Sequence, residues 1–218
     1  RVEDTMKHIL NTARTEVAEA FVMMTGIVAT LDNPDMEMLT AMRRVHDRGT
    51  NMHRIVQVNE ISRRYCRGEM TVEETYKELK QIKGKQYSVA VYNLATILVP
   101  VGFAPLFGGG VKETLVSAAV GCILAFLITL GKKIQICAFG VAVTAACVNR
   151  VTSGWNLDIV IISSLMPLVP GVAITNAIRD TLRGDYISGG ARILEAFLTA
   201  AAIGLGAGTG MIFVGGIV

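Results

Sequence analysis

Five long uncharged runs alternate with short charged segments in the second part of the chain. Each run holds 16 to 23 residues. A helix needs about 20 apolar residues to cross a hydrocarbon core of about 30 Å, so the pattern predicts five transmembrane helices. The runs cover residues 87–107, 114–130, 134–149, 159–178 and 196–218.

The fourth run is interrupted by prolines. Pro167 and Pro170 stand inside it, and Gly171 follows. Proline lacks a backbone donor and clashes with the preceding turn, so the helix is predicted to be kinked or interrupted here. Backbone groups freed in a membrane are tolerated where they face protein or a wet cavity.

The first part of the chain has shorter amphipathic patterns, which predict a small α+β domain over residues 1–86. Apolar residues recur at helical spacing near its start, and β-branched residues cluster further on. Thr71 and Glu74 form a capping-box pattern. The expected elements are a helix over 2–19, a strand over 21–31, a turn at 32–35, a returning strand over 36–45, and helices over 51–67 and 72–82.

Composition supports this division near Tyr87. The chain is 51% hydrophobic with a mean hydropathy of +0.47, which is typical of a membrane protein. Residues 1–86 hold 14 Lys and Arg and 13 Asp and Glu, whereas residues 87–218 hold 7 and 5. The net charge of +3 reflects a charge bias of the loops better than a nucleic-acid surface.

The positive charges of the loops predict an orientation. Cationic residues precede the first span and lie after the second and the fourth, whereas the opposite loops hold only Lys112 and Arg150. Positive loops stay inside, so we expect residues 1–86 in the cytoplasm and the C-terminus outside. The inside residues are Lys77, Lys80, Lys83, Lys85, Lys132, Lys133, Arg179, Arg183 and Arg192.

Metal binding and catalysis find little support in the pattern. His46 and His53 would share a helical face only if that helix already included residue 46, and no further ligands are evident. The four cysteines form no CxxC pair, so neither a disulfide framework nor a metal or other cofactor is expected. A hydrolase in residues 1–86 stays an outside alternative.

Polar residues gather around the turn between the fourth and fifth spans. Arginine there can hold a carboxylate in a two-point contact, an amide or hydroxyl can bond an amine, and the proline break can offer backbone dipoles. The predicted substrate-binding residues are Pro170, Gly171, Thr175, Asn176, Arg179, Asp180 and Arg192, and the predicted proton-coupling residues are Glu195 and Asp185.

Each of these residues also has a structural interpretation. Arginine at a cytoplasmic helix end can simply anchor the helix. Arg192 and Glu195 are three residues apart, a spacing that favours an ordinary ion pair. The clustering of kink, amide and paired charges in one segment favours the functional interpretation.

The same segment resembles the threonine/serine exporter family (ThrE), in particular its N-terminal, YjjP-like half. The resemblance lies in residues 170–180 (PGVAITNAIRD), in 184–189 (GDYISG), and in Arg192 with Glu195 and Ala196. Supporting matches are residues 1–5 (RVEDT), the Arg43-Arg44 pair, residues 46–49 (HDRG) with 51–53 (NMH), and residues 106–109 (LFGG). Taken together, the resemblance covers nearly the whole chain.

The resemblance implies a secondary exporter of small hydrophilic metabolites rather than an enzyme. Threonine or serine is the first expectation and a dicarboxylate such as succinate the alternative, with coupling to the proton motive force. It also implies a place in the inner (plasma) membrane, a second, smaller membrane subunit and a homo- or hetero-oligomer. The alternative is that this sequence is part of a longer exporter. A membrane-anchored scaffold or regulatory protein without transport activity is the remaining alternative.

Overall fold

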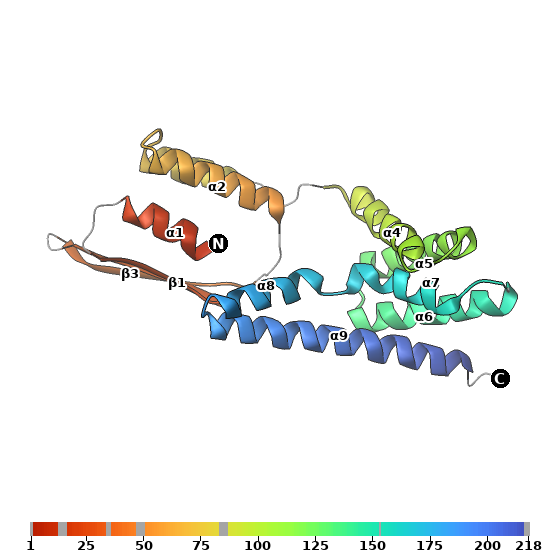
Figure 1. Ribbon diagram of the computed structural model, residues 1–218. Coiled ribbons are helices and arrows are strands. Elements are labelled where there is room, and N and C mark those ends of the chain that lie inside the picture. The colour runs from red at the N-terminus through yellow and green to blue at the C-terminus, as the bar shows by residue number, and fades with distance from the viewer. Residues whose placement is uncertain are drawn as a thin grey trace. The chain divides into compact units, whose positions relative to one another are not determined.

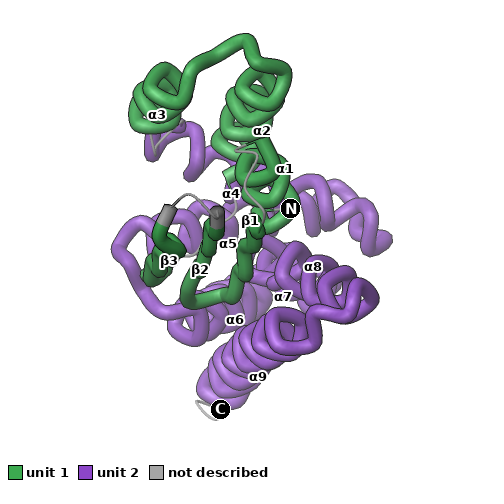
Figure 2. The backbone as a smooth tube through the Cα atoms, turned by 90° about the vertical axis from the view of Figure 1, so that its left-hand side faces the viewer, with its two compact units in different colours: residues 1–86 green, residues 87–218 purple. Residues whose placement is uncertain are grey.

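The computed structural model divides the chain into two compact units, Arg1–Gln86 and Tyr87–Val218 (Figures 1 and 2). It describes residues 2–12, 17–33, 36–46, 51–82, 87–152 and 154–215. Each unit is taken by itself below.

The first unit contains a three-stranded antiparallel sheet and three helices. The strands lie in the order β1-β2-β3, and α1 contacts both β1 and α2. The elements are α1 (Val2–Asn11), β1 (Val17–Val22), β2 (Gly26–Asn33), β3 (Met36–Arg44), α2 (Met52–Cys66) and α3 (Val72–Gln81).

Two sequence predictions in this unit were wrong. The helix expected over residues 2–19 ends at Asn11, and the strand expected over 21–31 is two strands. β1 pairs with β2 from Val17 opposite Asp32 to Val22 opposite Ile27. The tight turn between them closes with a hydrogen bond from Met23 N to Gly26 O, 2.8 Å long. Pairing between strands therefore overrides the helical spacing of residues 17–19.

The later elements match the sequence predictions. β3 returns along β2, and α2 begins after Asn51, whose side chain accepts a hydrogen bond from Arg54 N at 3.0 Å. The capping box of Thr71 and Glu74 opens α3. His46 lies before α2, so it does not share a helical face with His53. The predicted turn includes Pro34 and Asp35, which lie outside the described residues, as do residues 13–16, 47–50, 83–86 and 216–218.

The regular elements described in the second unit are all helices. Four of its helices are long and apolar enough to cross a membrane, and a bent pair supplies a fifth candidate, which confirms a mainly α-helical membrane fold. The elements are α4 (Val89–Leu106), α5 (Val111–Thr129), α6 (Ile134–Val151), α7 (Leu157–Leu165), the 3-10 helix η1 (Met166–Leu168), α8 (Gly171–Leu182) and α9 (Tyr186–Gly215).

Helices α5, α6 and α7 share the apolar core of this unit. Leu124, Val141 and Val160 are fully buried within it. α9 packs along α6, where Gly206 and Gly210 bring the two backbones close: a Cβ atom on Gly206 would lie 2.3 Å from Gln135 O. Small residues allow such close approach of membrane helices. This packing holds α9 in place beside the broken span.

Candidate functional site

The broken span is the first feature of the candidate site. The segment Leu157–Leu168 meets α8 at an angle of 59°. Gly171 N bonds to Val169 O across the break at 2.9 Å, and Pro170, the N-cap residue of α8, supplies no side-chain cap. The interruption predicted from the prolines is therefore present, and the N-terminal dipole end of α8 has no capping side chain.

The turn from α8 to α9 is tightly specified. Gly184 N bonds to Thr181 O at 3.0 Å and Asp185 N bonds to Asp180 O at 3.0 Å, while Gly184 has a φ of 86°. This is the Schellman arrangement, in which glycine takes the left-handed position. Asp185 Oδ1 then accepts a hydrogen bond from Ser188 N at 3.0 Å, as an N-cap residue does. Asp185 is thus the N-cap residue before α9, which begins at Tyr186.

Helices α8 and α9 lie against each other beyond this turn (Figure 1). Ala177 is fully buried between them. A Cβ atom on Gly189 would lie 2.3 Å from Thr181 Oγ1 and 3.2 Å from Ala177 O, so only glycine fits there. The hairpin is held by close backbone packing.

An ion pair between Asp180 and Arg192 joins the two arms of the hairpin. Arg192 Nε lies 3.1 Å from Asp180 Oδ2, and the two side chains are 37% and 27% exposed. The Nε atom is buried but makes no hydrogen bond to any described residue, so its N–H is not directed at that carboxylate oxygen. The sequence spacing favoured an ion pair of Arg192 with Glu195; the ion pair of Arg192 with Asp180 across the hairpin was not predicted.

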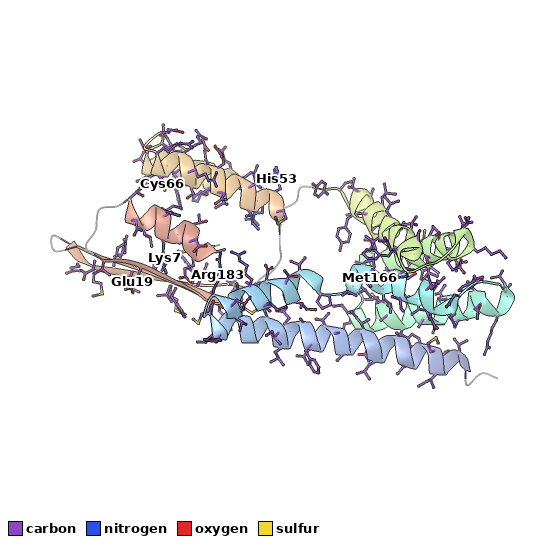
Figure 3. All side chains as sticks on the ribbon, in the orientation of Figure 1. Lys7, Glu19, His53, Cys66, Met166 and Arg183 are labelled. Carbon is purple, nitrogen blue, oxygen red and sulfur yellow. The ribbon has the colours of Figure 1, made fainter. Side chains whose placement is uncertain are left out.

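The predicted site residues fall into two groups along α8. Asn176 is half-buried on the same side of α8 as Asp180, four residues away, whereas Thr175 is exposed and donates its hydroxyl to Gly171 O at 3.0 Å. Pro170 and Gly171 lie at the break. Nine residues of helix, about 13 Å at 1.5 Å per residue, separate Gly171 from Asp180. In Figure 3 the labels Met166 and Arg183 mark the start of the break and the residue after the end of α8.

The remaining two predicted residues lie near the hairpin. Arg179 is half-buried on α8, next to Asp180. Glu195 lies on α9, one turn beyond Arg192, with an exposed side chain. Both carry charge within one or two turns of the Asp180–Arg192 ion pair. Among the described residues, no group of three or more His, Cys, Asp or Glu is placed to hold a metal ion.

A buried hydroxyl cluster beside the break has no counterpart in the sequence prediction of the site. Ser117 Oγ on α5 lies 2.9 Å from Ser163 Oγ on α7, and Ser163 donates to Val160 O at 3.1 Å. Ser164, also fully buried, has no hydrogen-bond partner for its hydroxyl among the described residues. Two adjacent serines in an apolar run were the only signal of this cluster.

Comparison with known proteins identifies the family. The family model ThrE, described as "Putative threonine/serine exporter", matches residues 1–214. The chain belongs to this family. A curated protein of Mycobacterium tuberculosis described as a "Probable threonine/serine exporter" is 22% identical over 197 residues, which cover 85% of this chain and 37% of that protein. No solved structure matches the chain.

These findings confirm the resemblance seen in the sequence. The ThrE family is described by transport, not by catalysis, and the apolar helices fit a multi-pass membrane protein. The chain spans little more than a third of the length of the Mycobacterium tuberculosis protein.

Proposed function

We propose that this ThrE-family chain forms part of an inner-membrane secondary exporter of threonine or serine. Its main support is the Asp180–Arg192 ion pair, which lies in a helical hairpin directly after a broken span. Both residues lie within candidate membrane-spanning helices, where ionisable side chains mark solute or ion pathways by default.

The ion pair is complementary to an amino acid. A zwitterion carries one carboxylate and one ammonium group, and Arg192 and Asp180 offer the opposite charges. Both side chains are partly exposed, and the Arg192 Nε–H is not used in a hydrogen bond within the described residues. We assign Arg192 to the carboxylate, Asp180 to the ammonium group, and Asn176 to the hydroxyl that threonine and serine share.

The other predicted residues extend this path along α8. Arg179 adds positive charge beside the ion pair, and Thr175 offers a hydroxyl oxygen nearer the break. At Pro170 and Gly171 the N-terminus of α8 has no side-chain cap, so its partial positive charge favours a carboxylate. We assign the break to a second position of the solute, about 13 Å from the first.

Proton coupling is assigned to Glu195. It lies one turn beyond Arg192 with an exposed side chain, close enough to sense a solute held by the ion pair. Asp185, the second carboxylate predicted for this role, caps α9 through Ser188 N, so we give it a structural function. A Glu195→Gln variant should retain exchange of labelled against unlabelled solute but lose net efflux driven by the proton gradient.

A smaller membrane subunit completes the proposed exporter. The matched region covers 37% of the Mycobacterium tuberculosis protein, and a second membrane part would correspond to some of the remaining length. Succinate is the alternative solute. It carries two negative charges and would find one arginine of the ion pair but be repelled by Asp180.

The decisive experiment is efflux of preloaded labelled threonine, serine and succinate from cells expressing the chain with and without the companion subunit. We expect threonine or serine efflux that requires the companion and stops with an uncoupler. Asp180→Asn and Arg192→Gln should each abolish efflux while Lys133→Gln, a cation at the N-cap of α6, should not.

The exchanged pair, Asp180→Arg with Arg192→Asp, separates structure from recognition. It restores opposite charges across the hairpin, so we expect normal expression and assembly but no efflux. Full efflux by the exchanged pair would show that the ion pair has only a structural role and does not recognise the solute. Absence of efflux for all three solutes by the wild-type pair of subunits would favour a scaffold instead.

A further inference from the structure

No described strand of the first unit pairs with the outer edge of its sheet. β3 is the last strand of the order β1-β2-β3, and α1 contacts β1 at the other edge. The side chains of residues 37–44 are all exposed, among them Met38 at 64%, Leu39 at 61% and Met42 at 69%. An exposed edge strand offers a row of unpaired backbone donors and acceptors to another strand, and a long apolar one is rarely left bare.

β3 is complementary to itself. If two copies run antiparallel about a twofold axis at Thr40, Glu37 of each copy lies directly opposite Arg43 of the other. Met38 then lies opposite Met42, on the other face of the strand. Opposite charges and apolar pairs that face each other across strands stabilise a sheet. β3 thus carries both members of each pair that would meet across an interface between two copies.

The same residues specify register and direction. A shift by two residues either way moves Glu37 away from Arg43 and places it opposite Ala41 or beyond the end of the strand. Parallel pairing in register would place Arg43 against Arg43. Only the antiparallel arrangement centred on Thr40 satisfies both charged residues of the pair, and a twofold axis uses the same surface on both copies.

The apolar face of the sheet continues across this edge. Val28 lies opposite Phe21 on one side and opposite Met42 on the other, so these three side chains share one face. Phe21 is 49% exposed. Joining two copies makes one six-stranded sheet, in which the methionines of both copies extend this row.

We infer that β3 pairs with β3 of a second copy of this chain and so makes the protein a homodimer through its first unit. The test is the dimer dissociation constant of the purified full-length chain in detergent, from sedimentation over a dilution series. Glu37→Lys and Arg43→Glu should each weaken the dimer at least tenfold, because each sets like charges opposite one another. The double variant should restore it to within threefold of the wild type.

Arg44→Glu is the matched control. It makes the same charge change one residue further on, where the opposite residue is Met36, so it should leave the dimer nearly intact. A second measurement fixes the register: in a chain without its four native cysteines, Thr40→Cys should form a disulfide-linked dimer, whereas Thr30→Cys on β2 should not. Circular dichroism of each variant checks that the unit is folded.

Three results would count against the inference, and the first two would overturn it. The first is a wild-type chain that stays monomeric at every concentration. The second is a dimer that both single charge variants leave unchanged, since it would then form through another surface. Failure of the double variant to recover, with the fold intact, would likewise exclude the register centred on Thr40.

Discussion

Two buried hydroxyls in the second unit are paired across helices. Ser117 on α5 and Ser163 on α7 lie 2.9 Å apart, and Ser163 also donates to Val160 O. Ser163→Ala leaves the Ser117 hydroxyl buried without a partner, which costs about 1–3 kcal/mol. We expect that loss of stability in a reversible detergent-unfolding measurement.

The matched variants distinguish this pair from a simple packing effect. Removal of both hydroxyls, Ser117→Ala with Ser163→Ala, should recover most of the loss, because no unsatisfied group remains. Ser164→Ala should cost little, since its hydroxyl has no partner in the described residues. An equal loss for Ser163→Ala and Ser164→Ala would contradict the assigned hydrogen bond.

Asp185 stabilises the start of α9 through an N-cap hydrogen bond. Its carboxylate accepts from Ser188 N, and loss of an N-cap costs about 0.5–2 kcal/mol. Asp185→Ala should therefore lower stability, whereas Asp185→Ser, which caps as well, should preserve both stability and proton-driven efflux. Loss of coupling in a stable Asp185→Ser variant would return Asp185 to the proton pathway.

Single residues of the candidate site were predictable, but their partners were not. Arg192 and Asp180 stood out because charges beside apolar runs are costly. Their pairing across twelve positions depends on the Schellman turn at Gly184 and on the close contact at Gly189, which set how the two helices meet. The serine cluster was missed because three hydroxyls on two helices have no periodicity of their own.

At the scale of elements, local signals succeeded where contacts are local. The capping box of α3 and the proline break of the fourth span involve neighbours in the sequence, and both were predicted in place. The helix expected over residues 2–19 failed because β1 is fixed by its partner β2, about ten residues further on. Strand pairing of that kind is not visible in helical spacing.

The start of α3 should depend on pH through Glu74. The Thr71 backbone N–H, 2.8 Å away, and then the Thr71 hydroxyl hold the pKa of Glu74 below its ordinary value of 4.5. A lowered folded-state pKa means that the capping contribution is complete above the unfolded value and is lost as pH falls through the folded one.

We therefore expect the Thr71 amide resonance to lose its hydrogen-bonded shift as the pH falls below about 4.5, as followed by NMR. Glu74→Gln keeps an acceptor oxygen but cannot titrate, so its Thr71 resonance should not change over that range. A pH response that persists in Glu74→Gln would assign the transition to another group.

Two pairs of glycines on α9 allow a comparison of stability, because one pair contacts α6 and the other does not. Gly206 and Gly210 face α6, where added Cβ atoms would lie 2.3 Å from Gln135 O and 2.8 Å from Phe139 O. Gly206→Ala or Gly210→Ala should cost about 1–3 kcal/mol, as overpacking does. Gly204→Ala and Gly208→Ala have no neighbour within 4 Å and should be close to neutral in the same unfolding measurement.

At the scale of the whole molecule, the division of charge suggests how the chain meets a membrane. Residues 1–86 hold 14 of the 21 cationic residues, and the four long helices with the bent pair make up to five spans. An odd number of spans places the two ends of the chain on opposite sides. We propose that the first unit is cytoplasmic, since positive loops stay inside.

Cysteine labelling in intact cells tests this orientation. In a chain without its native cysteines, Lys112→Cys at the start of α5 and Lys132→Cys after its end place one exposed thiol at each end of the same helix. We expect an impermeant maleimide to label Cys at 112 from outside, and to reach Cys at 132 only after permeabilisation. His53→Cys on α2 should behave like the latter. Labelling at 112 and 53 from the same side would mean that α4 does not cross the membrane between them, and so would contradict the proposed orientation.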